Sequence, residues 1–298
     1  MSEILVFGET GQVARQLKKL GQNRVICMGR AALDIRDADS VRAVVLDLRP
    51  QVVINAAAFT AVDKAEEVEN EALAVNGDGA AHIAMACGEI PLIHISTDYV
   101  FDGTACEPYS EDAPVCPVNA YGRSKLAGEE AVRRHAPNHV ILRTAWVYSY
   151  EGNNFVRTVL RLMTERYQLG IVDDQCGCPT SAQSIGEAIL YIAHQLETGT
   201  PSLFGTYHYV DGGETTWYGF ACEIYHAAQL IKGLSSVLKD VDIQPITTAQ
   251  YPLPANRPTY SVLSTRKFET TFDFPIRMWQ DRLEECLQAI SRQPEETL

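Results

Sequence analysis

Short apolar runs alternate with segments of helical spacing through the first half of the chain. The runs carry almost no polar position, which is typical of strands covered by helices on both faces. The segments between them repeat apolar residues about once per helical turn, with charged residues elsewhere. The expected strands are Ile4–Phe7, Arg24–Met28, Gln51–Ile54, Pro91–Ile95 and His139–Leu142, and the expected helices cover about 12–20, 41–48, 71–87 and 121–135.

This alternation predicts an α/β fold with a doubly wound parallel (Rossmann) sheet and right-handed crossovers. We expect residues 1–150 to form this dinucleotide-binding domain. Residues 151–298 are expected to form mainly a smaller, interleaved C-terminal substrate lobe, with segments near 183–212 returning to the first domain. Its expected elements are helices near 154–166, 183–195, 217–230 and 275–290, a strand near 205–210, and a loop-rich stretch with Pro245, Pro252, Pro254 and Pro258.

The composition is that of a globular protein, and its charge narrows the set of partners. The chain has 298 residues, of which 46% are hydrophobic and 21% charged, and its formal net charge is −13. So acidic a chain is not expected to bind nucleic acid or an anionic membrane surface. An anionic ligand would therefore have to be held by a local device, such as a helix N-terminus.

The expected location is the cytoplasm. The first residues lack the basic region and long apolar run of a secretory signal, and no later apolar stretch is long enough to span a bilayer. The eight cysteines are widely spaced except for Cys176 and Cys178. Reduced thiols are therefore favoured over a metal site or a disulfide framework.

A glycine-containing loop joins the first expected strand to the first expected helix. Gly8 permits a tight turn, and Gly11 lets a pyrophosphate approach backbone N–H groups at the helix N-terminus. Ala14 is small enough for close packing of the helix on the strand. Glu9 would be unfavourable beside a phosphate, so its side chain is expected to point away. The loop predicts a dinucleotide site, and a turn without a ligand is the alternative.

The residues after the second strand indicate which dinucleotide binds. A carboxylate at this place would hold a ribose diol, but the chain reads Met28-Gly29-Arg30. Arg30 is able to pair with a 2′-phosphate, which favours NADPH over NADH while leaving NADH open. An exposed arginine with no ligand is the alternative.

A tyrosine and a lysine four residues apart are the candidate catalytic pair. On a helix, Tyr121 and Lys125 share a face about one turn apart. A nearby cation stabilises a phenolate and would bring the tyrosine pKa from about 10 toward neutrality. Thr97 or Ser96, at the end of an expected strand, would add a second hydroxyl for a carbonyl that receives a hydride. The pair by itself is common on solvated helix faces, so it gains weight only with the dinucleotide loop.

Further blocks of sequence run in order over nearly the whole chain. They are Asn55–Glu66, Ser96–Gly103, Tyr121–Lys125, Arg143–Tyr148, Asn153–Phe155, Asp174 and Gln175 with Gly177, Pro179 and Thr180, Thr215–Tyr218, and Arg257 and Pro258 with Ser261 and Leu263. Together with the glycine loop, these blocks resemble the extended short-chain dehydrogenase/reductase family, and within it the dTDP-4-dehydrorhamnose reductase branch. Their number and order make this resemblance far more specific than the loop alone.

The resemblance implies that Tyr121 protonates the C4 alkoxide of a keto-sugar while a nicotinamide supplies hydride. Lys125 would lower the tyrosine pKa and hold the nicotinamide ribose, and Thr97 would hydrogen-bond the substrate carbonyl or tune Tyr121. Other cofactor-contacting positions that it implies are Gly11, Gln12, Val13, Asp34, Ile35, Ala58 and Thr60. The substrate-contacting positions are Thr97, Asp98 and Trp146, to which charge and position add Asn154 and Arg257 for the diphosphate.

Each assigned residue also has an ordinary structural role as its alternative, namely helix capping, a turn, a core position, a hydrogen-bond acceptor or a surface ion pair. Thr97, Thr60 and Asn154 are candidate helix caps, and Asp34 is a candidate turn residue. Trp146 is a candidate core residue, Asp98 a candidate hydrogen-bond acceptor, and Arg257 a candidate partner in a surface ion pair.

One position departs from the family's pattern. Some members bind Mg²⁺ at a dimer interface through a glutamate on the first helix, where this chain has Gln16. A neutral amide is a poor ligand for a hard cation. No Mg²⁺ site is therefore expected, and the chain is expected to be a monomer or a homodimer.

The resulting expectation is an NAD(P)H-dependent reductase that converts dTDP-4-dehydro-6-deoxy-L-mannose to dTDP-L-rhamnose for surface polysaccharide. The alternatives are a reductase or an epimerase of another nucleotide-linked 6-deoxy-sugar, and a non-catalytic regulatory subunit with the same fold. A regulatory subunit would be expected to lose Tyr121 or Lys125, and both are present.

Overall fold

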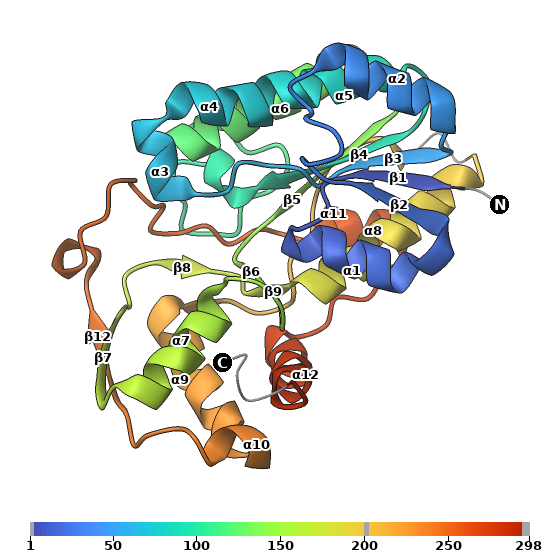
Figure 1. Ribbon diagram of the computed structural model, residues 1–298. Helices are drawn as coiled ribbons and strands as arrows, with labels where there is room; N and C mark the ends of the chain where they lie inside the picture. Colours follow the sequence, from blue (N-terminus) through green and yellow to red (C-terminus); the bar gives the residue numbers. More distant parts are fainter. Residues whose placement is uncertain (1–2, 200–202, 294–298) are drawn as a thin grey trace.

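A six-stranded parallel sheet organises the larger part of the molecule (Figure 1). The computed structural model describes residues 3–199 and 203–293. The strand order is β10-β5-β4-β3-β1-β2, and the pairings along it are parallel. The strands are β1 (Ile4–Phe7), β2 (Val25–Met28), β3 (Val52–Asn55), β4 (Leu92–Thr97), β5 (His139–Thr144) and β10 (Gly205–His208).

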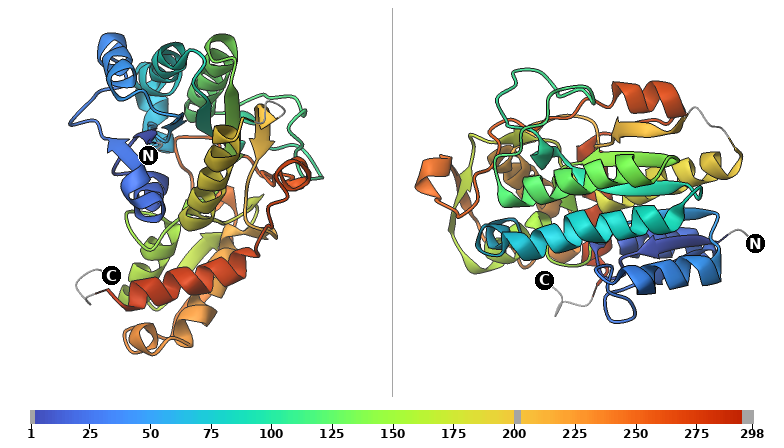
Figure 2. Two further views of the ribbon diagram at one scale, coloured as in Figure 1. Left: turned by 90° about the vertical axis from the view of Figure 1, so that its right-hand side faces the viewer. Right: turned by 90° about the horizontal axis from the view of Figure 1, so that it is seen from above.

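Helices cover both faces of this sheet, which confirms the predicted doubly wound α/β fold (Figures 1 and 2). One face carries α1 (Gln12–Gly21), α8 (Ala182–Glu197) and α11 (Arg266–Phe272), whose apolar side chains share one core with the strands. The other face carries α2 (Ala38–Leu48), α5 (Gly79–Cys87) and α6 (Ala120–His135) around a second core. Because β1 and β3 are buried along their whole length, their sequences have little room for polar side chains.

The strand order creates a switch point at β1 and β3. The chain adds β2 on one side of β1, then crosses to place β3 on the other side. Doubly wound sheets bind ligands outside the carboxyl ends of their strands at such a point. The segments that follow β1, β3, β4 and β5 therefore share one edge of the sheet.

A smaller part of the molecule lies next to this edge (Figure 1). Helices α7 (Phe155–Glu165), α9 (Trp217–Gln229), α10 (Lys232–Ser235) and α12 (Trp279–Ser291) contribute to its core. Its short strands pair as β6 (Val147–Tyr148) with β9 (Thr180–Ser181), β8 (Cys176–Gly177) with β11 (Thr215–Thr216), and β7 (Gln168–Val172) with β12 (Asp242–Ile246).

Besides α11, two elements from the second half of the chain belong to the sheet layer. Helix α8 packs against α1, and the two helices share one core with the strands. Strand β10 pairs with β5 in a register that runs from Gly205 opposite Val140 to His208 opposite Arg143. The outer strand on this side of the sheet is therefore supplied late in the sequence.

The helical character expected over 71–87 is confirmed, and the segment consists of α4 (Glu69–Leu73), a π-helical turn (Ala74–Asp78) that was not predicted, and α5. Helix α6 crosses it closely, since a Cβ on Gly128 would lie 2.2 Å from the Asn76 carbonyl oxygen. The turn also directs the polar Asn76 side chain into the protein, where it makes hydrogen bonds. Such π-turns are frequent at functional sites.

Several elements were not predicted. They include α3 (Val62–Glu67), α10, α11, β7, β12, the two-residue strands of the smaller part, and the 3₁₀ turns Gln22–Arg24, Asp98–Val100 and Thr248–Gln250. Strand β12 lies inside the stretch expected to be loop-rich and contains Pro245, which pairs opposite Ile171. A two-stranded ladder has only edge strands, so it tolerates proline. Within residues 3–199 and 203–293, no helix has the length and apolar character needed to cross a membrane.

Candidate active site

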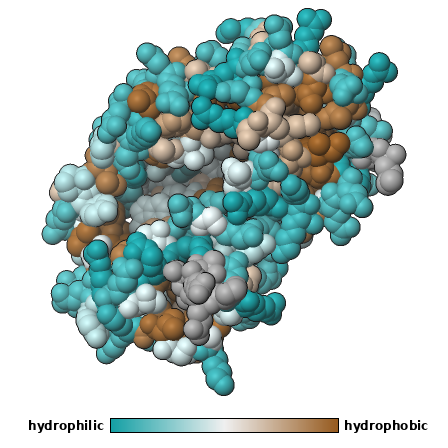
Figure 3. All heavy atoms as spheres, in the orientation of Figure 1, coloured by the Kyte–Doolittle hydropathy of each residue, from teal (hydrophilic) through white to brown (hydrophobic). Residues whose placement is uncertain are grey.

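A cavity of about 510 Å³ opens at the carboxyl edge of the sheet. Figure 3 shows a hollow between the upper and lower parts of the molecule. The cavity walls come from the segments after β1, β3, β4 and β5, from the start of α6, and from the start of α9. The predicted site residues that line it are Gly11, Gln12, Val13, Ala58, Thr60, Thr97, Asp98, Tyr121, Lys125, Trp146 and Asn154.

The other predicted site residues lie outside the lining of this cavity. They are Gly8, Arg30, Asp34, Ile35 and Arg257. Gly8 lies beneath the loop with φ of 112°, where a Cβ would come within 3.0 Å of the Ala56 carbonyl group, so only glycine fits. Ile35 packs in the core of the sheet layer. The assigned contacts of these residues with a cofactor or substrate stay predictions.

Local packing fixes Tyr121 in the cavity wall. Asn119 caps α6, because its side chain accepts a hydrogen bond from Gly122 N at 2.8 Å and donates one to the Asn256 carbonyl at 2.7 Å. A Cβ on Gly122 would lie 2.2 Å from the Tyr99 carbonyl oxygen, so glycine allows the close approach. The rings of Tyr99 and Tyr121 then meet edge to face with centroids 5.8 Å apart.

Thr97 lies at the end of β4 beside the phenol. Its hydroxyl accepts a hydrogen bond from Tyr99 N at 3.2 Å and donates one to Asp98 Oδ1 at 2.9 Å. The capping alternative is therefore confirmed, but the same hydroxyl also opposes the rise in the pKa of Tyr121 that burial causes. Ser96 lines the cavity too, but its hydroxyl helps to lower the pKa of Glu129 and is not among the groups that shift the pKa of Tyr121.

The electrostatics of the tyrosine and lysine differ from the expectation. Burial raises the pKa of Tyr121, the Thr97 hydroxyl opposes this, and the charge of Asp98 raises it further. Lys125 Nζ donates a hydrogen bond to the Ile95 carbonyl at 2.7 Å, and burial lowers the pKa of Lys125 to about 8. Lys125 is not among the groups that shift the Tyr121 pKa in this structure, so the expected lowering of that pKa by Lys125 stays a prediction. A phenol that keeps its proton is nevertheless suited to donate it.

A buried asparagine joins two walls of the cavity. Asn76 Oδ1 accepts a hydrogen bond from Phe59 N at 2.8 Å, and its Nδ2 donates to the Phe59 carbonyl at 3.0 Å and to Ser124 Oγ at 2.9 Å. Ser124 Oγ donates in turn to the Tyr121 carbonyl at 2.7 Å. The π-turn thus holds both the segment after β3 and the first turn of α6. Sequence reasoning missed this role, although a polar residue in an alanine-rich segment was a signal.

The glycine loop forms a cradle for an anion at the N-terminus of α1. Gly11 is the N-cap residue, and among the described residues no side chain hydrogen-bonds there. A Cβ placed on Gly11 would meet no described atom within 4 Å, so open space lies above the first turn. Free backbone N–H groups at such a terminus bind phosphate groups. These residues fit the pyrophosphate of a dinucleotide.

Trp146 lies in the opposite wall and stacks on a second tryptophan that was not predicted as a site residue. The rings of Trp146 and Trp217 are 3.5 Å apart and nearly parallel at 3°. Trp217 Nε1 donates a hydrogen bond to Gln175 Oε1 at 3.2 Å, which fixes the second ring. Trp146 has φ of 45°, a costly backbone conformation for a residue of this size. The signal for Trp217 was its place directly after the helix cap Thr216.

Gly177→Ala is expected to lower kcat/KM by about 10–100-fold through displacement of Trp146. A Cβ on Gly177 would lie 2.4 Å from Trp146 Cε2, so the indole must leave its stacked position. Steady-state kinetics would measure the loss, and a cofactor titration should give an unchanged affinity. Gly233→Ala is the control, because its added methyl group would meet Ser291 at an ordinary 3.4 Å. Unchanged kcat/KM in Gly177→Ala would contradict the role given to Trp146.

Asp98 is a buried carboxyl group in the cavity wall. Burial raises its pKa to about 6, although the hydroxyls of Ser261 and Thr97 oppose this shift. Its Oδ2 has no hydrogen-bond partner among the described residues. Such an oxygen is available to accept a hydrogen bond from a hydroxyl group of a ligand.

Asp98→Asn is expected to stabilise the protein at pH 7 while weakening activity. The folded-state pKa lies above the usual value of 3.8, so the ionised group costs stability as the pH rises through about 6. The substitution should raise the free energy of unfolding by about 1–3 kcal/mol at pH 7, and by much less at pH 4. Urea titrations at the two pH values measure this, and substrate KM should rise. An equal stability change at both pH values would refute the charge argument.

Asn154 and Arg257 both make the structural contacts that were their alternatives. Asn154 caps α7, and its Nδ2 also donates to Gln12 Oε1 at 3.1 Å, which ties it to the glycine loop. Arg257 Nη2 donates to Asp63 Oδ2 at 2.7 Å, and Nη1 donates to Asp63 Oδ1 at 3.2 Å. Binding of a diphosphate by either residue stays a prediction.

Gln16 is buried on α1, and its side-chain amide has no hydrogen-bond partner among the described residues. In the same hollow, Arg282 pairs with Glu285 at 3.0 Å, and it also pairs with Glu187 of α8. The guanidinium group thus pairs with both carboxylates, and Arg277 supplies a second cation to Glu285. In the part of the chain that the structure describes, no group of three or more His, Cys, Asp or Glu side chains is arranged to hold a metal ion.

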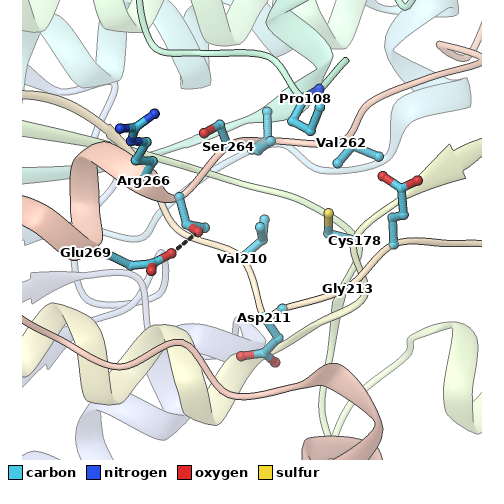
Figure 4. Close-up of a pocket in the computed structure, with 13 residues that line it drawn as sticks. Pro108, Cys178, Val210, Asp211, Gly213, Val262, Ser264, Arg266 and Glu269 are labelled. Atoms are coloured by element: carbon cyan, nitrogen blue, oxygen red, sulfur yellow. Dashed lines mark hydrogen bonds between the residues drawn. The ribbon is translucent and has the colours of Figure 1, made fainter. Parts of the chain in front are cut away.

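A second cavity, of about 350 Å³, lies between the segment after β10 and the start of α11 (Figure 4). Asp211 borders it, but this carboxylate accepts a hydrogen bond from Ser181 N at 2.8 Å and so supports the start of α8. Thr265 and Glu269 are hydrogen-bonded to each other across its edge. None of the predicted catalytic residues lines this cavity. The larger cavity is therefore the candidate active site.

Comparison with known proteins agrees with this geometry. The family described as "RmlD substrate binding domain" matches residues 1–292 of the chain. The chain is 39% identical over 292 residues to a dTDP-4-dehydrorhamnose reductase from Sinorhizobium fredii, with 96% of this chain and 97% of the relative covered.

Solved structures show the same similarity. A dTDP-4-dehydrorhamnose reductase from Clostridium acetobutylicum superimposes with a TM-score of 0.87 at 38% identity, covering 96% of this chain and 98% of the other. A dTDP-4-dehydrorhamnose reductase from Bacillus anthracis, solved in complex with NADP, also gives a TM-score of 0.87, at 33% identity and with 97% and 99% covered.

Proposed function

The chain belongs to the RmlD substrate binding domain family, and from this premise we propose that it reduces the C4 keto group of dTDP-4-dehydro-6-deoxy-L-mannose to give dTDP-L-rhamnose. NADPH is the reductant, with NADH as a further possibility, as the NADP complex of a relative supports. The observation that carries the proposal is the meeting of Tyr121, Thr97 and Lys125 in a cavity that begins at the glycine loop.

The proton step follows from the burial of Tyr121. A substrate carbonyl held against Thr97 and Tyr121 would receive the phenolic proton as negative charge develops on its oxygen. Burial keeps this proton on Tyr121 at neutral pH. Lys125, with a pKa of about 8, is mostly charged at neutral pH and would stabilise the phenolate that remains.

The rest of the cavity would bind the two ligands. The bound nicotinamide cofactor supplies the hydride. The α1 N-terminus would hold its pyrophosphate, and Ala58, Thr60 and Lys125 would contact it along the cavity wall. Asp98 would accept a hydrogen bond from a sugar hydroxyl, while the stacked ring of Trp146 would pack against the sugar.

We assign residues 1–150 to the binding of the dinucleotide and most of 151–298 to the binding of the nucleotide sugar. The glycine loop lies in the first segment and Trp217 in the second, which supports this division. We propose that the enzyme acts in the cytoplasm and that its product is used for surface polysaccharide.

The test is incubation of the purified protein with the dTDP-linked 4-keto-sugar and either NADPH or NADH. Loss of nicotinamide absorbance with formation of dTDP-L-rhamnose, identified by NMR, is the expected result. A different 6-deoxy-sugar as the product would overturn the substrate assignment. Tightly bound NAD⁺ and sugar conversion without net cofactor consumption would instead identify an epimerase.

A further inference from the structure

The glycine loop carries a carboxylate whose side chain lies over the end of β2. A Cβ placed on Gly29 would lie 2.7 Å from Glu9 Oε2 and 3.0 Å from Glu9 Cβ, so the glutamate rests on this glycine. The loop is tied to the strand because Gly8 N donates a hydrogen bond to the Met28 carbonyl at 2.9 Å. Glu9 therefore points away from the main cavity, as the sequence predicted, but toward another part of the dinucleotide site.

The end of β2 is where a doubly wound sheet distinguishes the two nicotinamide cofactors. A carboxylate there hydrogen-bonds the ribose diol of NADH, and a cation accommodates the 2′-phosphate of NADPH. That carboxylate is usually supplied by the strand, where this chain has Gly29. Because Gly29 leaves the space that Glu9 fills, the glycine loop supplies the negative charge instead.

The charges around this point are largely paired. Glu9 Oε1 lies 3.1 Å from Lys18 Nζ, so the most direct cation is already engaged. Arg36 Nη2 lies 2.5 Å from Asp34 Oδ2, and Arg30 Nε lies 3.8 Å from the same oxygen. A 2′-phosphate carries a charge between about −1.5 and −2 at neutral pH, if it behaves like a phosphorylated side chain. The 2′-phosphate would therefore meet the carboxylates of Glu9 and Asp34 as well as the three cations.

From this geometry we infer that Glu9 is a specificity-determining residue, which disfavours the 2′-phosphate of NADPH and favours the ribose diol of NADH. Glu9 thereby weakens the preference for NADPH that Arg30 alone would give. The inference rests on the proposed function, since it requires that a nicotinamide dinucleotide binds along the glycine loop. Lys18 partly compensates the negative charge of Glu9, because the two side chains form an exposed ion pair.

The test measures the dissociation constants of NADPH and NADH by calorimetric titration, without substrate. Glu9→Gln is expected to strengthen the binding of NADPH about tenfold relative to that of NADH. The reason is that the substitution removes the repulsion between the Glu9 carboxylate and the 2′-phosphate. Lys18→Gln should shift the ratio the other way, because it leaves Glu9 unpaired. The exposed Glu130→Gln on α6 removes the same charge elsewhere and should leave the ratio unchanged.

Ionic strength adds a second readout. The change in cofactor preference caused by Glu9→Gln should shrink when the salt concentration rises from about 0.01 to 1 M. Glu9 and Lys18 are both partly exposed, so salt screens the charge interactions at this place. If the unmodified protein binds both cofactors and Glu9→Gln leaves their ratio unchanged, the inference is wrong while the proposed function stands. If the unmodified protein binds neither cofactor, the proposed function itself fails.

Discussion

Replacing Tyr121 with phenylalanine is expected to reduce kcat by about 10²–10⁴-fold without weakening cofactor binding. The substitution removes the only part of this side chain that can deliver a proton. The edge-to-face contact of its ring with Tyr99 needs no hydroxyl, so the ring should keep its place. Hydride transfer would then have to proceed without a proton donor at the carbonyl, with Thr97 offering a hydrogen bond only.

Kinetic and binding measurements together separate a loss of the proton donor from a loss of cofactor binding. Single-turnover measurements with saturating cofactor would report the chemical step, and a titration would report cofactor affinity. Tyr191→Phe is a matched control, since this tyrosine on α8 packs against Phe274 in the sheet layer and does not line the cavity. A Tyr121→Phe protein that retains substantial kcat cannot be reconciled with the assigned proton donor.

Glu129→Gln is expected to lower the free energy of unfolding by about 3–5 kcal/mol at pH 7. Glu129 lies fully buried on α6, four residues after Lys125, and pairs with the buried Arg143 of β5. Arg143 donates from Nε and Nη2 to the two carboxylate oxygens at 2.8 Å each. An amide accepts at one oxygen only, so the substitution leaves a buried guanidinium group without its counter-charge.

The expected pH dependence has a definite sign. Burial alone would raise the pKa of Glu129, but hydrogen bonds and charge from Arg143 outweigh it and lower the pKa to about 2. The pair therefore contributes stability above the ordinary glutamate pKa of 4.5, and this contribution is lost as the pH falls toward about 2. The difference between the parent protein and Glu129→Gln should accordingly shrink between pH 5 and pH 3.

Two controls separate a buried pair from an exposed one. Glu165→Gln breaks an ion pair with Arg161 in which both side chains are about half exposed, and it should cost no more than about 1 kcal/mol. Replacing Glu129 and Arg143 together, by Leu and Met, should cost less than Glu129→Gln alone, because neither member of the pair is left buried without its partner. Urea titrations measure all three. A double variant less stable than Glu129→Gln would contradict this account.

The sequence predicted the central sheet, and most of the predicted site residues line the cavity. Runs such as Ile4–Phe7 are buried on both faces, so their sequence reports their environment directly. Residues such as Tyr121 and Lys125 carry chemistry in a spacing that local structure dictates, and both line the cavity. These features could be predicted because they depend on residues close together in the sequence or on blocks of sequence that match a known family.

What the sequence did not predict depends on contacts between distant segments. The π-turn at Ala74–Asp78 exists where α6 passes close to Asn76, and no periodicity in the segment reports that crossing. The pKa of Tyr121 depends on its burial, which spacing from Lys125 does not reveal. The stacking of Trp146 on Trp217 joins residues about seventy positions apart through the fold of the smaller part.

The late arrival of β10 has a consequence for synthesis on the ribosome. Until residues 205–208 have emerged, one edge of β5 has no partner strand. The apolar face of α1 likewise stays uncovered until α8 has been synthesised. An unpaired strand edge is a template for pairing with other chains. The nascent first half is thus exposed to aggregation and to chaperone binding while translation continues. Removal of β10 by a premature stop would leave the glycine loop and Tyr121 in a chain whose strand β5 keeps an unpaired outer edge.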